Sequence, residues 1–274
     1  KSLILFNRME VIISDKIKFG QFSNVFRYLP VFNMELVNIN VSSKGIYIQG
    51  MDSSQVCLFE LKLKEDWFDS FKTDKSYVLG IHSRTFYKVI QCLEYNEQVM
   101  KMNFNDDDYL NVALENKNGE NKINKYFELP LVDIDMEMLD IPETDYSVDM
   151  EIRSQSISNY IEQLLIFDET FTLSCSNETI KMKSKSESGS LSIEMSEENI
   201  LMYAVEDGMK NIEMCFALNY VKNMCAFSKI TKSVIISLSN DTPMRFHQSL
   251  DDSEIFEESE SYIRVYLAPK LDDD

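Results

Sequence analysis

The sequence predicts an α+β protein of two similar domains, each with two helices packed on antiparallel sheets. The first observation is an internal repeat, FSNVFRYLPVF at 22–32 and ISNYIEQLLIF at 157–167, with apolar, Ser-Asn and Phe positions in the same order. The second is that strand-like segments of the same kind follow both copies. An offset of about 135 residues is longer than a solenoid repeat and typical of a duplicated domain.

Each copy begins with an amphipathic helix. In the first copy the stripe is broad, and Pro30 is expected to end the helix. In the second copy Ile157, Tyr160, Ile161 and Leu164 follow helical spacing, with Ser154 as the expected N-cap. A second helix is predicted from Ser83, again as a cap, and its counterpart starts at Phe216. One apolar stripe per helix means that each helix covers one side of a sheet and leaves its other face in water.

Strand-like segments of alternating pattern fill the rest of both copies. LVNINV and SKGIYIQ follow the first helix, and TFTLSC and NETIKMK follow its counterpart. Pairs of strands around an acidic turn follow the second helices, in VMKMNFNDDDYLNVAL and VIISLSNDTPMRFHQ. In VCLFELKL, alternate residues from Cys57 to Leu63 share one apolar face.

Composition narrows the class of protein. The chain has 274 residues, 44% of them hydrophobic, and no apolar run near the roughly 20 residues that span a bilayer. We therefore expect a soluble intracellular protein with no membrane partner. Five scattered cysteines without a CxxC pair, and two histidines far from them, favour buried free thiols and predict neither a metal site nor a cofactor.

The charge is unevenly placed. A net charge of −19 argues against a simple nucleic-acid binder, because such proteins present a basic field. The water-facing sides of the predicted helices nevertheless carry few acids. Their basic residues include Lys18, Arg27, Arg84, Lys88 and Lys222. Such a surface, without stacking aromatic residues, suits sequence-independent contact with phosphates.

Three separated segments resemble one family. GIYIQGMDSSQVCLFELKL, DMEMLDIPETDYS and VYLAPKL are similar to signature segments of proliferating cell nuclear antigen, the sliding clamp, and the resemblance runs from Met9 to Leu271. It implies the DNA clamp fold, in a homotrimeric ring that encircles double-stranded DNA without sequence preference and tethers DNA polymerase and other replication and repair proteins. It also implies a clamp loader as a partner, no enzymatic activity, and a place in the nucleus, or at the site of viral DNA replication.

The resemblance implies a hydrophobic pocket for a partner peptide, with apolar anchors in a groove. Its expected residues are Met51, Gln55, Val56, Leu58, Leu139, Ile141, Pro142, Tyr146, Pro243, Tyr266, Leu267, Ala268, Pro269 and Leu271. The implied DNA-binding residues are Lys16, Lys18, Arg27, Arg84, Lys88 and Lys222. Two positions of the third helix that are usually arginine in the family are Asn159 and Glu162, so DNA contact is expected to depend on the first domain.

The resemblance also divides the chain. The expected parts are an N-terminal extension at 1–8, clamp domain 1 at 9–132, an interdomain connector at 133–145, and clamp domain 2 with a C-terminal tail at 146–274. Strands near Lys122–Leu129 and Thr179–Ser184 are expected to pair between chains. An insertion at 249–262 is interpreted as a flexible acidic loop.

Other functions remain open at this point. The chain could be one subunit of a checkpoint-type clamp, in which three different chains form the ring, or a viral processivity factor that forms no ring. A metal-dependent enzyme using Asp106, Asp107 and Asp108 is a third class, because carboxylate clusters hold magnesium. No constellation in the sequence assigns an acid, a base and a nucleophile, which argues against an enzyme.

Overall fold

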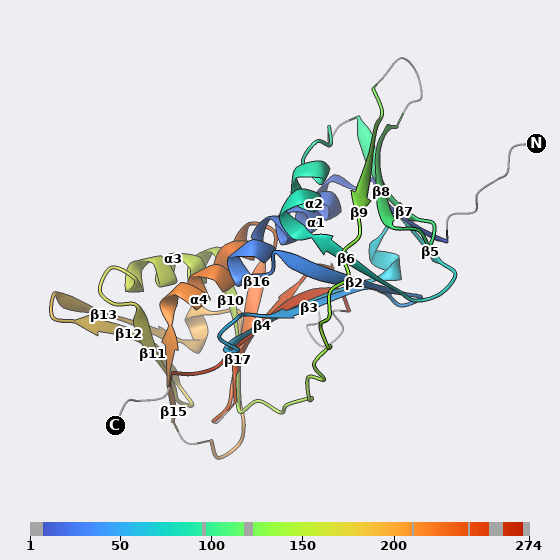
Figure 1. Cartoon of the computed structure of the whole chain (residues 1–274). Helices are drawn as coiled ribbons and strands as arrows, with labels where there is room; N and C mark the ends of the chain where they lie inside the picture. The colour runs from blue at the N-terminus through green and yellow to red at the C-terminus, as the bar shows by residue number, and fades with distance from the viewer. Residues whose placement is uncertain are drawn as a thin grey trace, which may run out of the picture. The chain divides into compact units, whose positions relative to one another are not determined.

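The computed structural model describes residues 8–94, 97–117, 123–209, 211–240, 242–251 and 260–270 (Figure 1). The chain divides into two compact units. Unit 1 comprises Lys1–Gly50, Glu60–Leu139 and Glu257–Tyr262; unit 2 comprises Met51–Phe59, Asp140–Phe256 and Ile263–Asp274. Most of the expected N-terminal extension and of the acidic insertion at 249–262 lies outside the described residues.

The elements of the first half are β1 (Met9–Ile13), α1 (Lys16–Tyr28), η1 (Leu29–Phe32), β2 (Leu36–Ser42), β3 (Gly45–Met51), β4 (Cys57–Lys64), η2 (Glu65–Trp67), β5 (Ser70–Thr73), β6 (Tyr77–His82), α2 (Ser83–Ile90), β7 (Gln98–Phe104), β8 (Tyr109–Asn116) and β9 (Lys125–Pro130).

The elements of the second half are β10 (Val148–Arg153), α3 (Ser154–Leu164), β11 (Thr170–Cys175), β12 (Thr179–Ser186), β13 (Gly189–Ser196), η3 (Glu197–Asn199), β14 (Met202–Val205), β15 (Ile212–Ala217), α4 (Leu218–Met224), η4 (Cys225–Lys229), β16 (Ser233–Leu238), β17 (Met244–Ser249) and β18 (Tyr262–Leu267).

The two halves repeat the same order of helices and strands. The first half runs from β1 to β9 and the second from β10 to β18. In each half the order is one strand, a helix, five strands, a second helix and three strands. The strand order β5-β1-β7-β8-β9 in the first half matches β14-β10-β16-β17-β18 in the second. The order β6-β2-β3-β4 likewise matches β15-β11-β12-β13. The α+β prediction with a duplicated domain is therefore confirmed.

The sheet order corrects one expectation about pairing between chains. β12, which contains the segment expected to pair with another chain, lies between β11 and β13 and is hydrogen-bonded on both sides. An interior strand has no free edge to offer. The end strand of this sheet is β13, whereas β9, on the first-half segment, does lie at the end of its sheet.

The helices of each unit cover apolar sheet faces. In unit 1, α1 contacts α2 through an aromatic cluster, in which the ring centroids of Phe26 and Phe86 are 4.5 Å apart and those of Phe22 and Phe26 are 4.9 Å apart. Phe26 and Phe86 are fully buried. In unit 2, Ile157, Ile161 and Leu164 of α3 are buried, as their spacing predicted, whereas Tyr160 is only half-buried.

The helix caps differ from those predicted. Ser83 and Ser154 lie inside their helices, whose N-caps are His82 and Arg153 without a side-chain hydrogen bond. The Ser83 hydroxyl donates to Met34 O at 2.7 Å, and that of Ser154 lies 3.0 Å from Thr231 Oγ1. Serine is a good cap only where its oxygen faces the helix N–H groups, and here both oxygens are engaged by neighbouring segments.

Two features of composition can be checked directly. None of the described helices is long and apolar enough to cross a membrane. Cys57, Cys175 and Cys225 are buried as expected, and burial raises the pKa of each of these thiols to about 12. Cys92 is exposed, against expectation, because it follows the end of α2.

Candidate functional site

The loop between β3 and β4 is organised by one buried carboxylate. Asp52 is 4% exposed, and its side chain accepts hydrogen bonds from the amides of Ser54, Val56 and Cys57 at 3.2, 2.9 and 2.7 Å. The Tyr220 hydroxyl, on α4, donates to Asp52 Oδ2 at 2.8 Å. Burial acts to raise the pKa of Asp52, but these hydrogen bonds outweigh it and hold the pKa below its usual range.

This loop presents apolar side chains to solvent. Gln55 has a left-handed backbone with φ of 59°, which reverses the chain between Asp52 and β4. Met51 and Val56 are 37% and 36% exposed, although they flank a buried carboxylate and a buried thiol. The Asp52 hydrogen bonds thus hold two apolar side chains at the surface of unit 2.

The last described segment of the chain lies beside this loop. The Ala268 amide donates to Val56 O at 2.9 Å, directly after β18. Two residues later, the Lys270 amide donates to Cys215 O at 2.8 Å, which attaches the segment to β15. These backbone bonds tie down a terminal segment that would otherwise fray. They place Tyr266, Ala268 and Pro269, all partly exposed, next to the loop.

The start of domain 2 is fixed by an arginine. Arg245 on β17 lies over the ring of Tyr146, with its guanidinium carbon 4.6 Å from the ring centroid. The same guanidinium donates to Ser237 Oγ at 2.9 Å and lies 3.6 Å from Asp149 Oδ1. The ring of Tyr146 is therefore partly covered by a residue of its own unit.

In unit 1, the segment after β9 runs along the sheet that contains β2, β3 and β6. The Val132 amide donates to Gly80 O at 2.9 Å, and the Asn38 side chain donates to Ile134 O at 3.1 Å. Gln49 pairs twice with Leu139, donating to its carbonyl at 2.9 Å and accepting from its amide at 2.7 Å. Asn38 and Gln49 are 8% and 6% exposed. Their buried side-chain amides therefore make hydrogen bonds to the backbone of a segment that is not part of a strand.

The basic residues of the helices are mostly in unit 1. Lys16, Lys18 and Arg27 belong to α1, and Arg84 and Lys88 belong to α2. Arg84 is paired with Glu35 at 3.1 Å, which offsets part of its charge, and the Lys18 ammonium lies 5.8 Å from the centroid of the Trp67 ring. In unit 2, Lys222 is exposed on α4.

Comparison with known proteins decides the family. The family model for proliferating cell nuclear antigen, N-terminal domain, matches residues 23–138, and the model for its C-terminal domain matches residues 140–270. Proliferating cell nuclear antigen of the fungus Chaetomium thermophilum is 30% identical over 246 residues, which cover 86% of this chain and 90% of that protein.

The chain belongs to the proliferating cell nuclear antigen family. It is therefore a sliding-clamp protein of DNA replication and not an enzyme, and its two units have the clamp fold. The carboxylates of the acidic turn between β7 and β8 are engaged by neighbouring groups. Asp106 pairs with Arg8, and with Lys75 at 3.4 Å, while Asp107 Oδ1 accepts from the Tyr109 amide at 3.1 Å. In the described part of the chain, no group of three or more possible ligands is arranged to hold a metal ion.

The residues expected to line a clamp pocket fall into three groups. In unit 2, Met51, Gln55, Val56, Pro142 and Pro243 are exposed, and Leu58, Ile141, Tyr146, Tyr266, Ala268 and Pro269 are partly exposed. Leu267 is 1% exposed, so its side chain packs in the core and offers no wall to a peptide. Leu139 is 46% exposed but belongs to unit 1, and Leu271 lies outside the described residues.

Several structural residues of this clamp protein were not singled out from the sequence. Asp52, Tyr220, Asn38, Gln49 and Arg245 position the loop, the connector and Tyr146. The only sequence signal for Asp52 is a turn-forming MDSS segment, and a carboxylate there is more often exposed. The other four make contacts between residues far apart in the chain, which local patterns do not encode.

Proposed function

We propose that the chain is the subunit of a homotrimeric sliding clamp that encircles duplex DNA and tethers DNA polymerase and other replication and repair proteins. Its connector is 133–145, between clamp domains at 9–132 and 146–274. The protein acts in the nucleus, or at the site of viral DNA replication. A clamp loader opens the ring. The relative from Chaetomium thermophilum, by its name an antigen of proliferating cell nuclei, supports the nuclear assignment.

The observation that carries the ring is the internal repeat. β18, the last strand of the second half, is the neighbour of β4 in the sheet. In the repeat, β9 of the first half corresponds to β18, and β13 of the second half corresponds to β4. Within one chain, β9 and β13 both end their sheets. Pairing β9 of one chain with β13 of the next would copy the β18–β4 arrangement. Such a head-to-tail contact joins two different edges and can either close into a ring or continue as a filament, and we propose that it closes.

Exposed apolar side chains at the β9 edge support this pairing. Ile123 is 75% exposed and Tyr126, on β9, is 68% exposed. Clustered apolar exposure beside an end strand is typical of an interface. The partner strand β13 offers the half-buried side chains of Leu191 and Ile193.

For partner proteins, we propose the pocket formed in unit 2 by Met51, Val56, Ala268 and Pro269 with Ile141 and Pro142, the connector residues of that unit. A short helical turn bearing aromatic and aliphatic anchors would place its side chains on these apolar groups, and its extended flank would pair along the C-terminal segment. The Asp52 hydrogen bonds hold the loop that carries Met51 and Val56 in place within this unit.

Solution mass tests the ring. Light scattering of the purified chain over a dilution series should give the mass of three chains. Replacing Tyr126 with Asp should give monomers, because it places a charge at the proposed β9–β13 contact while changing a side chain that is already exposed in the single chain. Val78→Asp, at another side chain that is 63% exposed, is the matched control and should remain trimeric.

A monomer at every concentration would overturn the homotrimer. Recovery of a three-chain mass only in the presence of two different clamp-related chains would instead establish a checkpoint-type ring. A monomer that still increases the processivity of a polymerase would establish a factor that works without a ring.

A further inference from the structure

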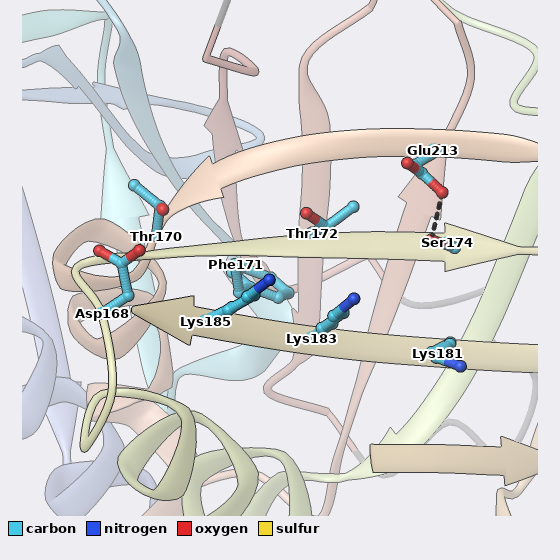
Figure 2. A pocket seen from close by; sticks show the side chains of 9 residues that line it. All are labelled: Asp168, Thr170, Phe171, Thr172, Ser174, Lys181, Lys183, Lys185 and Glu213. Atoms are coloured by element: carbon cyan, nitrogen blue, oxygen red, sulfur yellow. Dashed lines mark hydrogen bonds between the residues drawn. The ribbon is translucent and has the colours of Figure 1, made fainter. Parts of the chain in front are cut away.

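Three lysines lie in a row along one strand, on the exposed face of a sheet in unit 2. Lys181, Lys183 and Lys185 are alternate residues of β12, so they project from the same face (Figure 2). The neighbouring strand β11 places Ser174 opposite Lys181 and Thr172 opposite Lys183. With Asp168, Thr170, Phe171 and Glu213, these residues line a hollow of about 460 Å³. We call Lys181, Lys183 and Lys185 the lysine row.

Two members of the row have no acidic partner among the described residues. The Lys181 ammonium lies 2.6 Å from Glu194 Oε1, on the adjacent strand β13. Lys183 and Lys185 are exposed, and neither makes an ion pair in the part of the chain that the structure describes, since Glu213 accepts instead from the Ser174 hydroxyl at 3.0 Å. The chain has 46 acidic and 27 basic residues, so two neighbouring lysines on one face without acidic partners in the described structure are unexpected. Their mutual repulsion favours an anion between or above them.

The spacing of the row points to the shape of that anion. Alternate residues of a strand are about 6.6 Å apart, which is also the spacing of alternate side chains in any extended peptide. A second extended chain lying on this face could therefore bring one carboxylate to each lysine. β12 is an interior strand, so this chain would contact side chains and would not add to the sheet by backbone pairing. Thr172 would supply a hydroxyl donor beside the ammonium groups.

The acids around the row argue against a long polyanion. Asp168 and Glu213 line the hollow, and Glu194 is paired with Lys181 at one end of the row. A nucleic acid continuing past the lysines would bring its phosphates against these carboxylates. A short segment with acidic residues only at its centre avoids that repulsion.

We propose that the lysine row is a second protein-binding site, separate from the clamp pocket, which takes an extended acidic segment with carboxylates at alternate residues. Lys183 and Lys185 bind the two central carboxylates. Lys181 contributes less, because Glu194 already neutralises it. A partner with such a segment would be held on unit 2 without occupying the loop around Asp52.

The test uses two labelled peptides of identical composition, one with three glutamates at alternate positions among threonines and one with the glutamates adjacent. Fluorescence anisotropy with the full chain at low salt should show tighter binding of the alternating peptide. K183S/K185S should weaken that binding about ten-fold, since each exposed ion pair contributes modestly. K229S/K232S removes two lysines elsewhere in unit 2 and should change the affinity less than about two-fold.

A charge reversal guards against a folding artefact. K183E/K185E should lose the acidic peptide and bind a peptide with lysines at the same alternate positions, which a misfolded variant would not do. Equal affinity for the two acidic peptides, or an equal loss in K229S/K232S, would overturn the proposal. The proposal would also be overturned if single-stranded DNA bound more tightly than the alternating peptide and this binding depended on Lys183 and Lys185. A rise in peptide affinity on removing residues 272–274 would overturn it too, because the chain's own acidic end would then be the occupant.

Discussion

Asp52 determines the conformation of the loop that exposes Met51 and Val56. Its carboxylate accepts from three backbone amides and from the Tyr220 hydroxyl, so it replaces water for four donors at once. A buried carboxylate is costly unless it is bonded in this way. Because the bonds favour the ionised form, the stability of the loop depends on pH.

We expect Asp52→Asn to lower the free energy of unfolding by about 1–3 kcal/mol at pH 7, since a charged acceptor of several hydrogen bonds is lost. The pKa of Asp52 is depressed in the folded state, so its contribution is present above the unfolded pKa of about 3.9 and is lost as the pH falls through the folded value. The difference between the two proteins should therefore shrink below about pH 4. Urea unfolding at a fixed protein concentration, at pH 7 and near pH 3, measures this.

Asp133→Asn is the control, because Asp133 is exposed on the segment after β9 and the substitution makes the same chemical change at the surface. It should change the unfolding free energy little at either pH. A constant difference for Asp52→Asn across the pH range would show that the hydrogen bonds do not depend on the charge.

Gly80 sets how closely the connector approaches its sheet. A Cβ atom there would lie 1.9 Å from Val132 O, so Gly80→Ala has to displace the segment that carries Leu139. We expect lower stability and a several-fold loss of affinity for a partner peptide, measured by calorimetry. Gly20→Ala, in the middle of α1 with nothing within 4 Å, should instead stabilise by about 0.5–1 kcal/mol through helix propensity and leave peptide affinity unchanged. Unchanged affinity in both variants would separate the connector from the binding site.

At the scale of elements, local patterns predicted the helices and strands well and their neighbours poorly. Alternation identified β2, β11 and both sides of the acidic turns, because side-chain burial is periodic along a strand. The assignment of β12 as a pairing edge failed, since order within a sheet depends on contacts between strands distant in sequence. The Asp15 cap of α1 was also missed, as its helix starts earlier than the apolar stripe suggested.

The helices also differ in the charges on their exposed sides. α3 carries exposed Glu162 and no base in its last turn, whereas α1 and α2 together carry five cations. We expect Glu162→Arg to increase DNA affinity and to steepen its salt dependence, by about 0.9 in the log–log slope for each additional phosphate that the protein neutralises. Glu178→Arg, at the exposed turn between β11 and β12, changes the charge equally and should leave the slope unaltered. An equal steepening in both variants would mean that the salt dependence of DNA affinity reflects net charge alone.

At the scale of the whole molecule, the net charge of −19 opposes assembly and DNA binding in different ways. In the proposed ring three such chains would repel one another, and salt screens this repulsion over about 10 Å at 0.1 M. DNA contact through lysines weakens with salt, because the release of counterions then favours binding less. We therefore expect the trimer to resist dilution better at about 150 mM than at about 20 mM salt, while affinity for linear duplex DNA falls over the same range. Light scattering and anisotropy on the same samples would measure both responses. A trimer that dissociates more readily at the higher salt would show that the β9–β13 contact is held by ion pairs rather than by backbone pairing and the apolar groups of Ile123 and Tyr126.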